Sequence, residues 1–119
     1  MEKHKNRTVA VVGSRGIKSC AALARRLAEL EPALVVSGGA AGVDAIAADW
    51  ARTHGVPLLE LRPDYATHGL TAAPHVRNAE IVKRAHLVLV VWDGRSKGTL
   101  STLRAARRLG RPYELLPLD

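Results

Sequence analysis

Short apolar runs alternate along this chain with longer segments in which apolar residues recur three and four positions apart. Strands give the first pattern and amphipathic helices the second, so their alternation predicts repeated β-α-β units. The predicted strands are residues 8–12, 34–36, 57–61, 86–92 and 111–116, and the predicted helices are residues 19–30, 42–54, 76–84 and 99–109. The remaining long stretch, residues 62–75, is expected to be an irregular loop.

Two of the predicted strands contain a continuous apolar run, which limits the kind of sheet they can enter. Residues 9–12 read Val-Ala-Val-Val, and residues 87–91 read Leu-Val-Leu-Val-Val. Strands without a polar face are typical of a parallel sheet covered by helices on both sides. We therefore expect an α/β, Rossmann-like, doubly wound fold with a five-stranded, mainly parallel sheet in the order 3-2-1-4-5. Residues 8–119 are predicted to form one domain and residues 1–7 a flexible basic N-terminus.

The composition excludes several classes of protein. No apolar run approaches the ~20 residues of a membrane span, and the start lacks an export signal, so a cytoplasmic protein without a membrane partner is expected. Cys20, the only cysteine, is interpreted as a packing residue, and the five histidines show no metal spacing, so no metal is expected. The net charge of +7 permits a nucleic-acid partner, but the basic residues are dispersed and aromatic residues make up only 3%.

Polar, glycine-rich segments follow three of the predicted strands. They are Gly13-Ser14-Arg15-Gly16, Ser37-Gly38-Gly39 and the segment from Asp93 to Thr99. In open α/β sheets, ligands bind outside the carboxyl ends of the strands, where the strand order reverses. Glycine lets a ligand approach the backbone, and the N–H groups at a helix start favour an anion. The sequence therefore predicts a site for a phosphorylated small molecule.

Two common phosphate motifs do not fit this chain. The nucleoside-triphosphate loop needs a lysine and a hydroxyl residue directly after its second glycine, whereas Lys97 precedes Gly98. The dinucleotide fingerprint begins with glycine where this chain has Ser37, although Glu60 lies about where a ribose-binding acid is expected. We therefore expect no cofactor.

The glycine-rich segments, taken together with Arg77-Asn78 and Gly98-Thr99, resemble the SLOG superfamily, and the segment Ser37 to Asp44 is its most extended match. This superfamily groups the DNA-processing protein A family with the Lonely Guy phosphoribohydrolases and with small stand-alone members. The resemblance runs from Val9 to about Pro112. It implies a Rossmann-like fold and a nucleotide or nucleotide-derived ligand.

The two branches of this superfamily imply different functions. Arg77 and Thr99 match the Lonely Guy catalytic segment, but Thr102 stands in place of its glutamate. Cleavage of an N-glycosidic bond needs a carboxylate, so such an enzyme would have to use Asp44 or Asp93, or Asp64 on the predicted loop. The stretch Ser37 to Asp44 looks more like the DNA-processing family, which binds single-stranded DNA, and Arg77-Asn78 also fits that family. This branch leaves a single-stranded nucleic acid open as a partner.

The favoured interpretation is a nucleotide-binding or sensor module, and the alternatives are a nucleotide N-glycosidase and a single-stranded DNA-binding protein. Whether the chain is an enzyme stays open, and a homodimer or higher homo-oligomer is expected. The candidate catalytic residues, if it is an enzyme, are Asp44 and Asp93. The candidate ligand-binding residues are Gly13, Ser14, Arg15, Ser37, Gly38, Gly39, Gly42, Asp44, Arg77, Asn78, Trp92, Gly94, Ser96, Gly98 and Thr99.

Overall fold

The computed structural model describes residues 7–119, and within them strands and helices alternate along the chain. The predicted N-terminal segment 1–7 lies, apart from Arg7, outside the described residues. The elements, in chain order, are β1 (Thr8–Gly13), α1 (Ala21–Leu30), β2 (Leu34–Ser37), α2 (Val43–Thr53), β3 (Leu58–Glu60), α3 (Tyr65–Arg84), β4 (Leu87–Val91), α4 (Lys97–Arg108) and β5 (Tyr113–Leu115).

The five strands form one parallel sheet in the order β3-β2-β1-β4-β5, which confirms the predicted doubly wound, Rossmann-like fold. β1 lies at the centre, where Val9 is the register partner of Val35 on β2 and of Leu87 on β4. The chain runs outward from β1 to β3 and then crosses back to β4. The strand order therefore reverses between β1 and β4, where this class of fold binds ligands.

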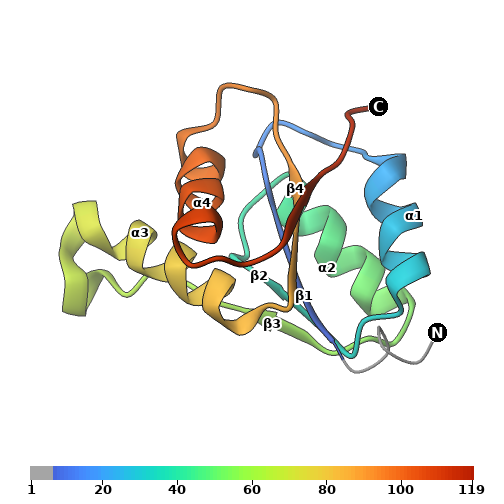
Figure 1. Cartoon of the computed structure of the whole chain (residues 1–119), viewed down its shortest axis with the longest axis horizontal. Coiled ribbons are helices and arrows are strands. Elements are labelled where there is room, and N and C mark those ends of the chain that lie inside the picture. Colours follow the sequence, from blue (N-terminus) through green and yellow to red (C-terminus); the bar gives the residue numbers. More distant parts are fainter. Residues whose placement is uncertain (1–6) are drawn as a thin grey trace.

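Helices cover both faces of the sheet, as predicted (Figure 1). α1 and α2 pack on one face, where Leu23 and Leu27 meet the side chains of Val9 and Val11. α3 and α4 pack on the other face, where Ile81 and Leu103 join Val12 in a second cluster. Alternate residues of β1 thus enter opposite clusters, which is why this strand is apolar at consecutive positions.

The start of α1 is capped from the far end of the described chain. Cys20 occupies the cap position but makes no capping hydrogen bond with its side chain. Instead, the Ala21 N–H donates to Asp119 Oδ1 at 2.7 Å, and Ser19 Oγ donates to Asp119 Oδ2 at 2.7 Å. Cys20 is buried, as expected of a packing residue, and its Sγ donates to the Pro117 carbonyl at 3.5 Å.

The prediction of an irregular loop over residues 62–75 was wrong, because α3 already begins at Tyr65. Asp64 caps this start by accepting a hydrogen bond from the Thr67 N–H at 3.1 Å. Gly69, with φ near +80°, then breaks the helix into two segments, and Pro74 lies one turn beyond the break. Proline and glycine favoured a loop in the sequence, but a capped turn followed by a glycine break accommodates both in helical structure.

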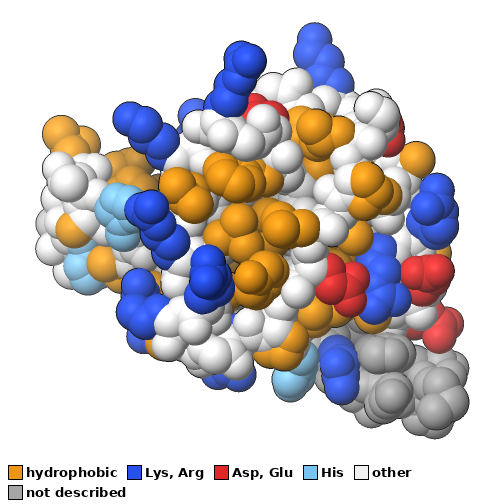
Figure 2. Space-filling model, turned by 45° about the horizontal axis from the view of Figure 1, so that its top comes forward, with side chains coloured by type: hydrophobic (Ala, Val, Ile, Leu, Met, Phe, Trp, Pro, Cys, Tyr) orange, Lys and Arg blue, Asp and Glu red, His pale blue; other side chains and the backbone are white. Residues whose placement is uncertain are grey.

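β5 is an edge strand, and its exposed side chains are mainly apolar. Tyr113 and Leu115 are 36% and 58% exposed. In Figure 2, hydrophobic side chains gather in the middle of one face, and Lys and Arg side chains are spread around them rather than aligned. Within the described residues, no helix combines the length and apolar character needed to cross a membrane.

Candidate ligand-binding site

A cleft of about 490 Å³ opens at the carboxyl ends of β1 and β4, at the point where the strand order reverses. We call it the main cleft. The β1–α1 loop, the β2–α2 turn, α3 and the β4–α4 loop all contribute to its wall. The wall comprises Val12, Gly13, Arg15, Gly16, Gly38, Ala40, Asp44, Pro74, Arg77, Asn78, Ile81, Asp93, Arg95, Ser96, Gly98, Thr99 and Thr102.

The loop after β1 connects the other segments of the wall. A Cβ at Gly13 would lie 2.4 Å from the Val91 carbonyl oxygen and 2.5 Å from Val43 Cγ2, so only glycine fits between β4 and α2. Ser14 is buried, and its Oγ accepts a hydrogen bond from the Asp93 N–H at 3.0 Å. The Ser14 carbonyl accepts one from the Val43 N–H at 3.3 Å. These contacts hold the β1–α1 loop against the start of the β4–α4 loop and the start of α2.

The glycine turn between β2 and α2 uses its own backbone donors internally. Gly39 N–H donates to Ser37 Oγ at 3.4 Å, and Ala40 N–H donates to Asp44 Oδ2 at 3.1 Å. Gly42 has φ near +74°, and a Cβ there would lie 2.4 Å from the Ser14 carbonyl oxygen. The Asp44 carboxylate thus occupies the position at this turn where an anionic ligand was expected to bind.

Asp44 and Arg77 face each other across the turn. Asp44 is only 7% exposed, and this burial raises the pKa of its carboxyl group, against the opposing effects of the Ala40 N–H and the Arg77 charge. Burial likewise lowers the pKa of the half-buried Arg77 guanidinium, although the Asp44 charge raises it. Each charge therefore offsets part of the desolvation penalty of the other.

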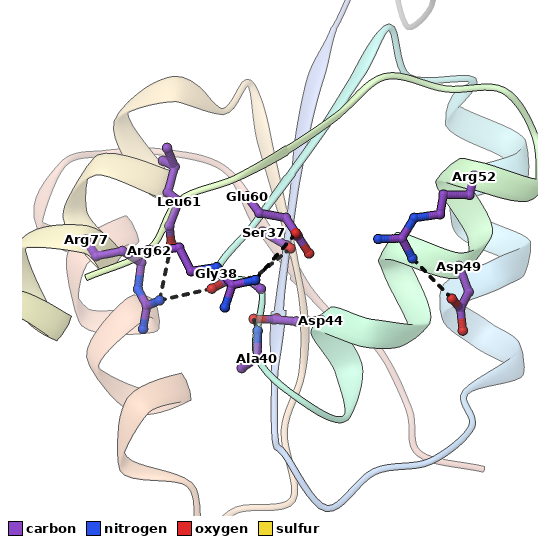
Figure 3. Close-up of polar contacts among 11 residues, drawn as sticks. Ser37, Gly38, Ala40, Asp44, Asp49, Arg52, Glu60, Leu61, Arg62 and Arg77 are labelled. Carbon is purple, nitrogen blue, oxygen red and sulfur yellow. Dashed lines mark hydrogen bonds and ion pairs between the residues drawn. The ribbon is translucent and has the colours of Figure 1, made fainter. Parts of the chain in front are cut away.

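Arg77 also links α3 to two other segments (Figure 3). Its Nη1 donates to the carbonyl oxygens of Gly38 at 3.2 Å and Leu61 at 3.3 Å, and its Nε donates to Asn78 Oδ1 at 2.8 Å. The Asn78 amide in turn donates to Ser101 Oγ on α4 at 3.3 Å. Arg77 and Asn78 line the main cleft, but these bonds show that both also hold its wall together.

The β4–α4 loop places a helix N-terminus at the cleft. Asp93 accepts hydrogen bonds from the N–H groups of Arg95 at 2.8 Å and Ser96 at 3.0 Å, and these bonds lower the pKa of its carboxyl group. Ser96 caps α4, and its Oγ accepts from the Thr99 N–H at 3.3 Å. There is open space beside Gly98, and the first turn of α4 carries no acidic residue. This helix start can therefore receive an anion from the cleft.

Thr102 and Trp92 lie beside this helix start but are engaged with the backbone. Thr102 is buried, and its Oγ1 donates to the Gly98 carbonyl at 3.2 Å. Trp92 Nε1 donates to the Ser96 carbonyl at 3.0 Å, and its ring packs on the cluster that joins α3 and α4 to the sheet. Trp92 thus braces the β4–α4 loop.

Most of the predicted site residues meet in the main cleft. Ten do so: Gly13, Arg15, Gly38, Asp44, Arg77, Asn78, Asp93, Ser96, Gly98 and Thr99. The other predicted residues do not line it: Ser14, Ser37, Gly39, Gly42, Trp92 and Gly94. Sequence reasoning missed Arg95, although it lies in the polar segment after β4, and Pro74 and Ile81, whose helix was not fully predicted. Among residues 7–119, no group of three or more His, Cys, Asp or Glu side chains could hold a metal ion.

The fold defines a Rossmann-like α/β protein with a cleft at the sheet switch point. The family model described as "YAcAr: YspA, cpYpsA-related SLOG family" matches residues 7–68, just over half of the chain. The chain belongs to this SLOG family, and thus to the superfamily that the sequence motifs resemble.

Solved structures of DNA processing protein A share this fold. The protein from Helicobacter pylori, described for its single-stranded DNA binding mode, is 24% identical with a TM-score of 0.72, covering 97% of this chain and 67% of that one. The protein from Streptococcus pneumoniae is 23% identical with a TM-score of 0.72, covering 98% of this chain and 52% of that one. The chain thus spans about two thirds and about half of these proteins. No curated protein matches it.

Proposed function

We propose that this protein is a binding or sensor module that takes a nucleotide, or a related phosphorylated small molecule, in the main cleft. One observation carries the proposal: Arg15, Arg77 and Arg95 converge with the N-terminus of α4 on one cavity of about 490 Å³. Ligand pockets typically measure roughly 300–1,000 Å³, so this volume suits a nucleotide. The two acids of the wall, Asp44 and Asp93, already accept backbone hydrogen bonds.

In this proposal the phosphate binds at the start of α4. Backbone N–H groups near Gly98 and the hydroxyl of Ser96 donate to it, and the exposed side chains of Arg15 and Arg95 add charge-assisted hydrogen bonds. The glycine turn serves as a close-fitting wall, because its donors are satisfied by Ser37 and Asp44. Arg77 keeps that wall in place and contributes positive charge.

Calorimetry with the four ribonucleoside 5′-monophosphates and their unphosphorylated nucleosides tests the proposal. At least one monophosphate should bind clearly tighter than its nucleoside. Arg15→Ala and Arg95→Ala should each weaken its binding by about 1.5–3 kcal/mol, the scale of a charged hydrogen bond. Arg52→Ala is the matched control, because Arg52 is exposed on α2 and pairs with Asp49 away from the cleft (Figure 3). The absence of monophosphate binding, or an equal loss in the control, would refute the assignment.

Asp44 is the observation that favours the enzyme alternative, a nucleotide N-glycosidase. It lines the main cleft, and burial raises the pKa of its carboxyl group, as a general base requires. Two observations count against this role. The Asp44 carboxylate already accepts a hydrogen bond from the Ala40 N–H, and Thr102, which donates to the Gly98 carbonyl, provides no second carboxylate. We therefore expect the monophosphate that binds to release no free base, as followed by chromatography. Base release that Asp44→Asn abolishes without loss of affinity would establish the enzyme instead.

The structural similarity to DNA processing protein A favours a second alternative, binding of single-stranded DNA. On the face that Figure 2 shows, the basic side chains are scattered rather than arranged along one track, so this face does not suit a nucleic-acid backbone. Titration of an oligonucleotide at several salt concentrations separates the two ligands. A steep decrease of affinity with salt, together with no monophosphate binding, would favour the nucleic acid.

A further inference from the structure

A second cavity of about 360 Å³ adjoins the main cleft. The two share Arg15, Gly38, Ala40, Pro74 and Arg77 as a common wall, so they are compartments of one continuous depression. The second compartment is completed by residues that follow β3, chiefly Arg62 and Tyr65. Its volume alone falls within the rough range of 300–1,000 Å³ seen for ligand pockets.

Arg62 is placed in this second compartment by the glycine turn. A Cβ at Gly39 would lie 3.0 Å from Arg62 Cζ, so the guanidinium lies directly over a residue that has no side chain. Its ion pair with Glu60 is long, at 3.8 Å, and its side chain is 69% exposed. Arg62 is therefore available to a ligand, whereas Arg77 is engaged by carbonyl groups.

Three like charges come together at the junction of the two compartments. Burial chiefly lowers the pKa of the Arg77 guanidinium, and the nearby charges of Arg15 and Arg62 lower it further. Asp44 faces Arg77 and offsets part of this repulsion, and the long ion pair with Glu60 offsets part of the charge of Arg62. An anionic ligand between the three arginines would offset the repulsion further. Tyr65, at the start of α3, is 49% exposed and adds an aromatic ring to the far side of the second compartment.

We propose that the two compartments form one bipartite site for a dinucleotide, with the first nucleotide in the main cleft and the second against Arg62 and Tyr65. This inference rests on the proposed function and specifies its ligand class. The phosphate of the first nucleotide would stay at the start of α4, and that of the second would lie near Arg15 and Arg77, where the positive charge is concentrated. The second base would stack on Tyr65 and its phosphate would pair with Arg62. A pyrophosphate-linked dinucleotide and a phosphodiester-linked one share this chemistry.

Calorimetry with three adenine ligands tests the proposal: adenosine 5′-monophosphate, diadenosine 5′,5′-diphosphate and the 5′-phosphorylated dinucleotide pApA. If the monophosphate panel selects another base, the same three ligands are built on that base. At least one dinucleotide should bind tenfold or more tightly than the monophosphate. A preference for the pyrophosphate linkage indicates a free dinucleotide, and a preference for the phosphodiester indicates a unit of a nucleic-acid strand.

Variants of the second compartment separate this inference from the proposed function. Arg62→Gln and Tyr65→Leu should each remove most of the tenfold gain and leave the monophosphate affinity unchanged. Arg52→Gln is the control, because Arg52 has a similar exposure, 65%, and a similarly long ion pair of 3.5 Å. Equal affinity for all three ligands, or loss of monophosphate binding in both variants, would overturn the bipartite site alone. Absence of binding by every ligand would overturn the proposed function.

Discussion

Replacing Arg77 by methionine should destabilise the protein as well as alter the cleft. Methionine keeps an apolar stem of similar length but removes the hydrogen bonds to Gly38, Leu61 and Asn78. Each bond from a charged donor contributes about 1.5–3 kcal/mol, and the two carbonyl bonds are long enough to fall at the lower end. Buried Asp44 also loses its facing cation. Breaking a fully buried pair costs about 3–5 kcal/mol, but Arg77 is only partly buried, so solvent reduces this effect.

Gly38 lines the open cleft, so water can replace part of the lost hydrogen bonding. We therefore expect a net loss of about 3 kcal/mol in the free energy of unfolding for Arg77→Met, less than the sum of the separate contributions. In a domain of this size, such a loss corresponds to a decrease in Tm of roughly 10 °C or more. Urea denaturation of the wild type, the single variants Arg77→Met and Asp44→Asn, and the double variant measures it. The double variant should be more stable than the sum of the single effects predicts, by about 1 kcal/mol, because the unpaired carboxylate is absent.

The pH dependence of this loss has a definite sign. Because the folded protein raises the pKa of Asp44, it holds a proton over a pH range in which the unfolded chain does not. Stability therefore falls as pH rises through that range, and more strongly when Arg77 is absent. The destabilisation by Arg77→Met should be largest near pH 7 and should decrease as the pH is lowered towards 4. A loss below about 1 kcal/mol, or one independent of pH, would refute the structural role assigned to this pair.

Two further predictions concern the frame that holds the cleft. Gly13→Ala should destabilise the protein by about 3 kcal/mol or more in urea denaturation, because its Cβ would meet the Val91 carbonyl at 2.4 Å. Gly16→Ala should be neutral, because a Cβ there would have no atom within 4 Å other than those of its chain neighbours. Similar stability of the two variants would contradict the close packing of β1, β4 and α2. Asp119→Ala should lower the Tm near neutral pH, because it removes the cap of α1. The hydrogen bond from the Ala21 N–H holds the pKa of Asp119 below its ordinary value of 3.8. The stabilisation that Asp119 provides is therefore present above pH 3.8 and is lost as the pH falls below that value. The Tm difference should close in acid, and a constant difference would exclude the charged cap.

The sheet could be predicted from the sequence because its central strands, β1 and β4, are apolar on both faces. Residues 9–12 and 87–91 admit few alternatives to central parallel strands, and the handedness of crossovers then fixes the strand order. The segment before residue 76 was harder, because Gly69 and Pro74 are typical of a loop. The cap by Asp64, three residues before Thr67, was the available signal for a helix there. Asp119 at the start of α1 could not be predicted, because its partner is 98 residues away.

The meeting of the predicted site residues followed from one topological rule, but their individual roles did not. Residues after β1, β2 and β4 come together because the carboxyl ends of parallel strands share an edge. The same rule, applied to β3, would have placed Arg62 at this edge. Pattern alone could not show that Arg77 donates to the carbonyls of Gly38 and Leu61, because these bonds depend on how α3 packs against the glycine turn.

The glycine turn shows most clearly that a sequence motif typical of ligand binding can have a structural role instead. Its sequence favours an anion, and the fold does place one there, but this anion is the Asp44 carboxylate rather than a ligand. A side chain that fills the turn keeps it in one conformation without a ligand, and Gly38 can then approach the Arg77 guanidinium, which lies 2.9 Å from where its Cβ would be. A phosphate entering this turn would have to displace Asp44, whose burial leaves it little room to move. At the start of α4, Asp93 accepts the N–H groups of Arg95 and Ser96, and Ser96 Oγ accepts that of Thr99. Among the described residues, no side chain accepts a hydrogen bond from the N–H groups of Lys97 and Gly98, and there is open space beside Gly98. We therefore propose the start of α4 and the exposed arginines as the anion site of this cleft, with the glycine turn as its rigid wall.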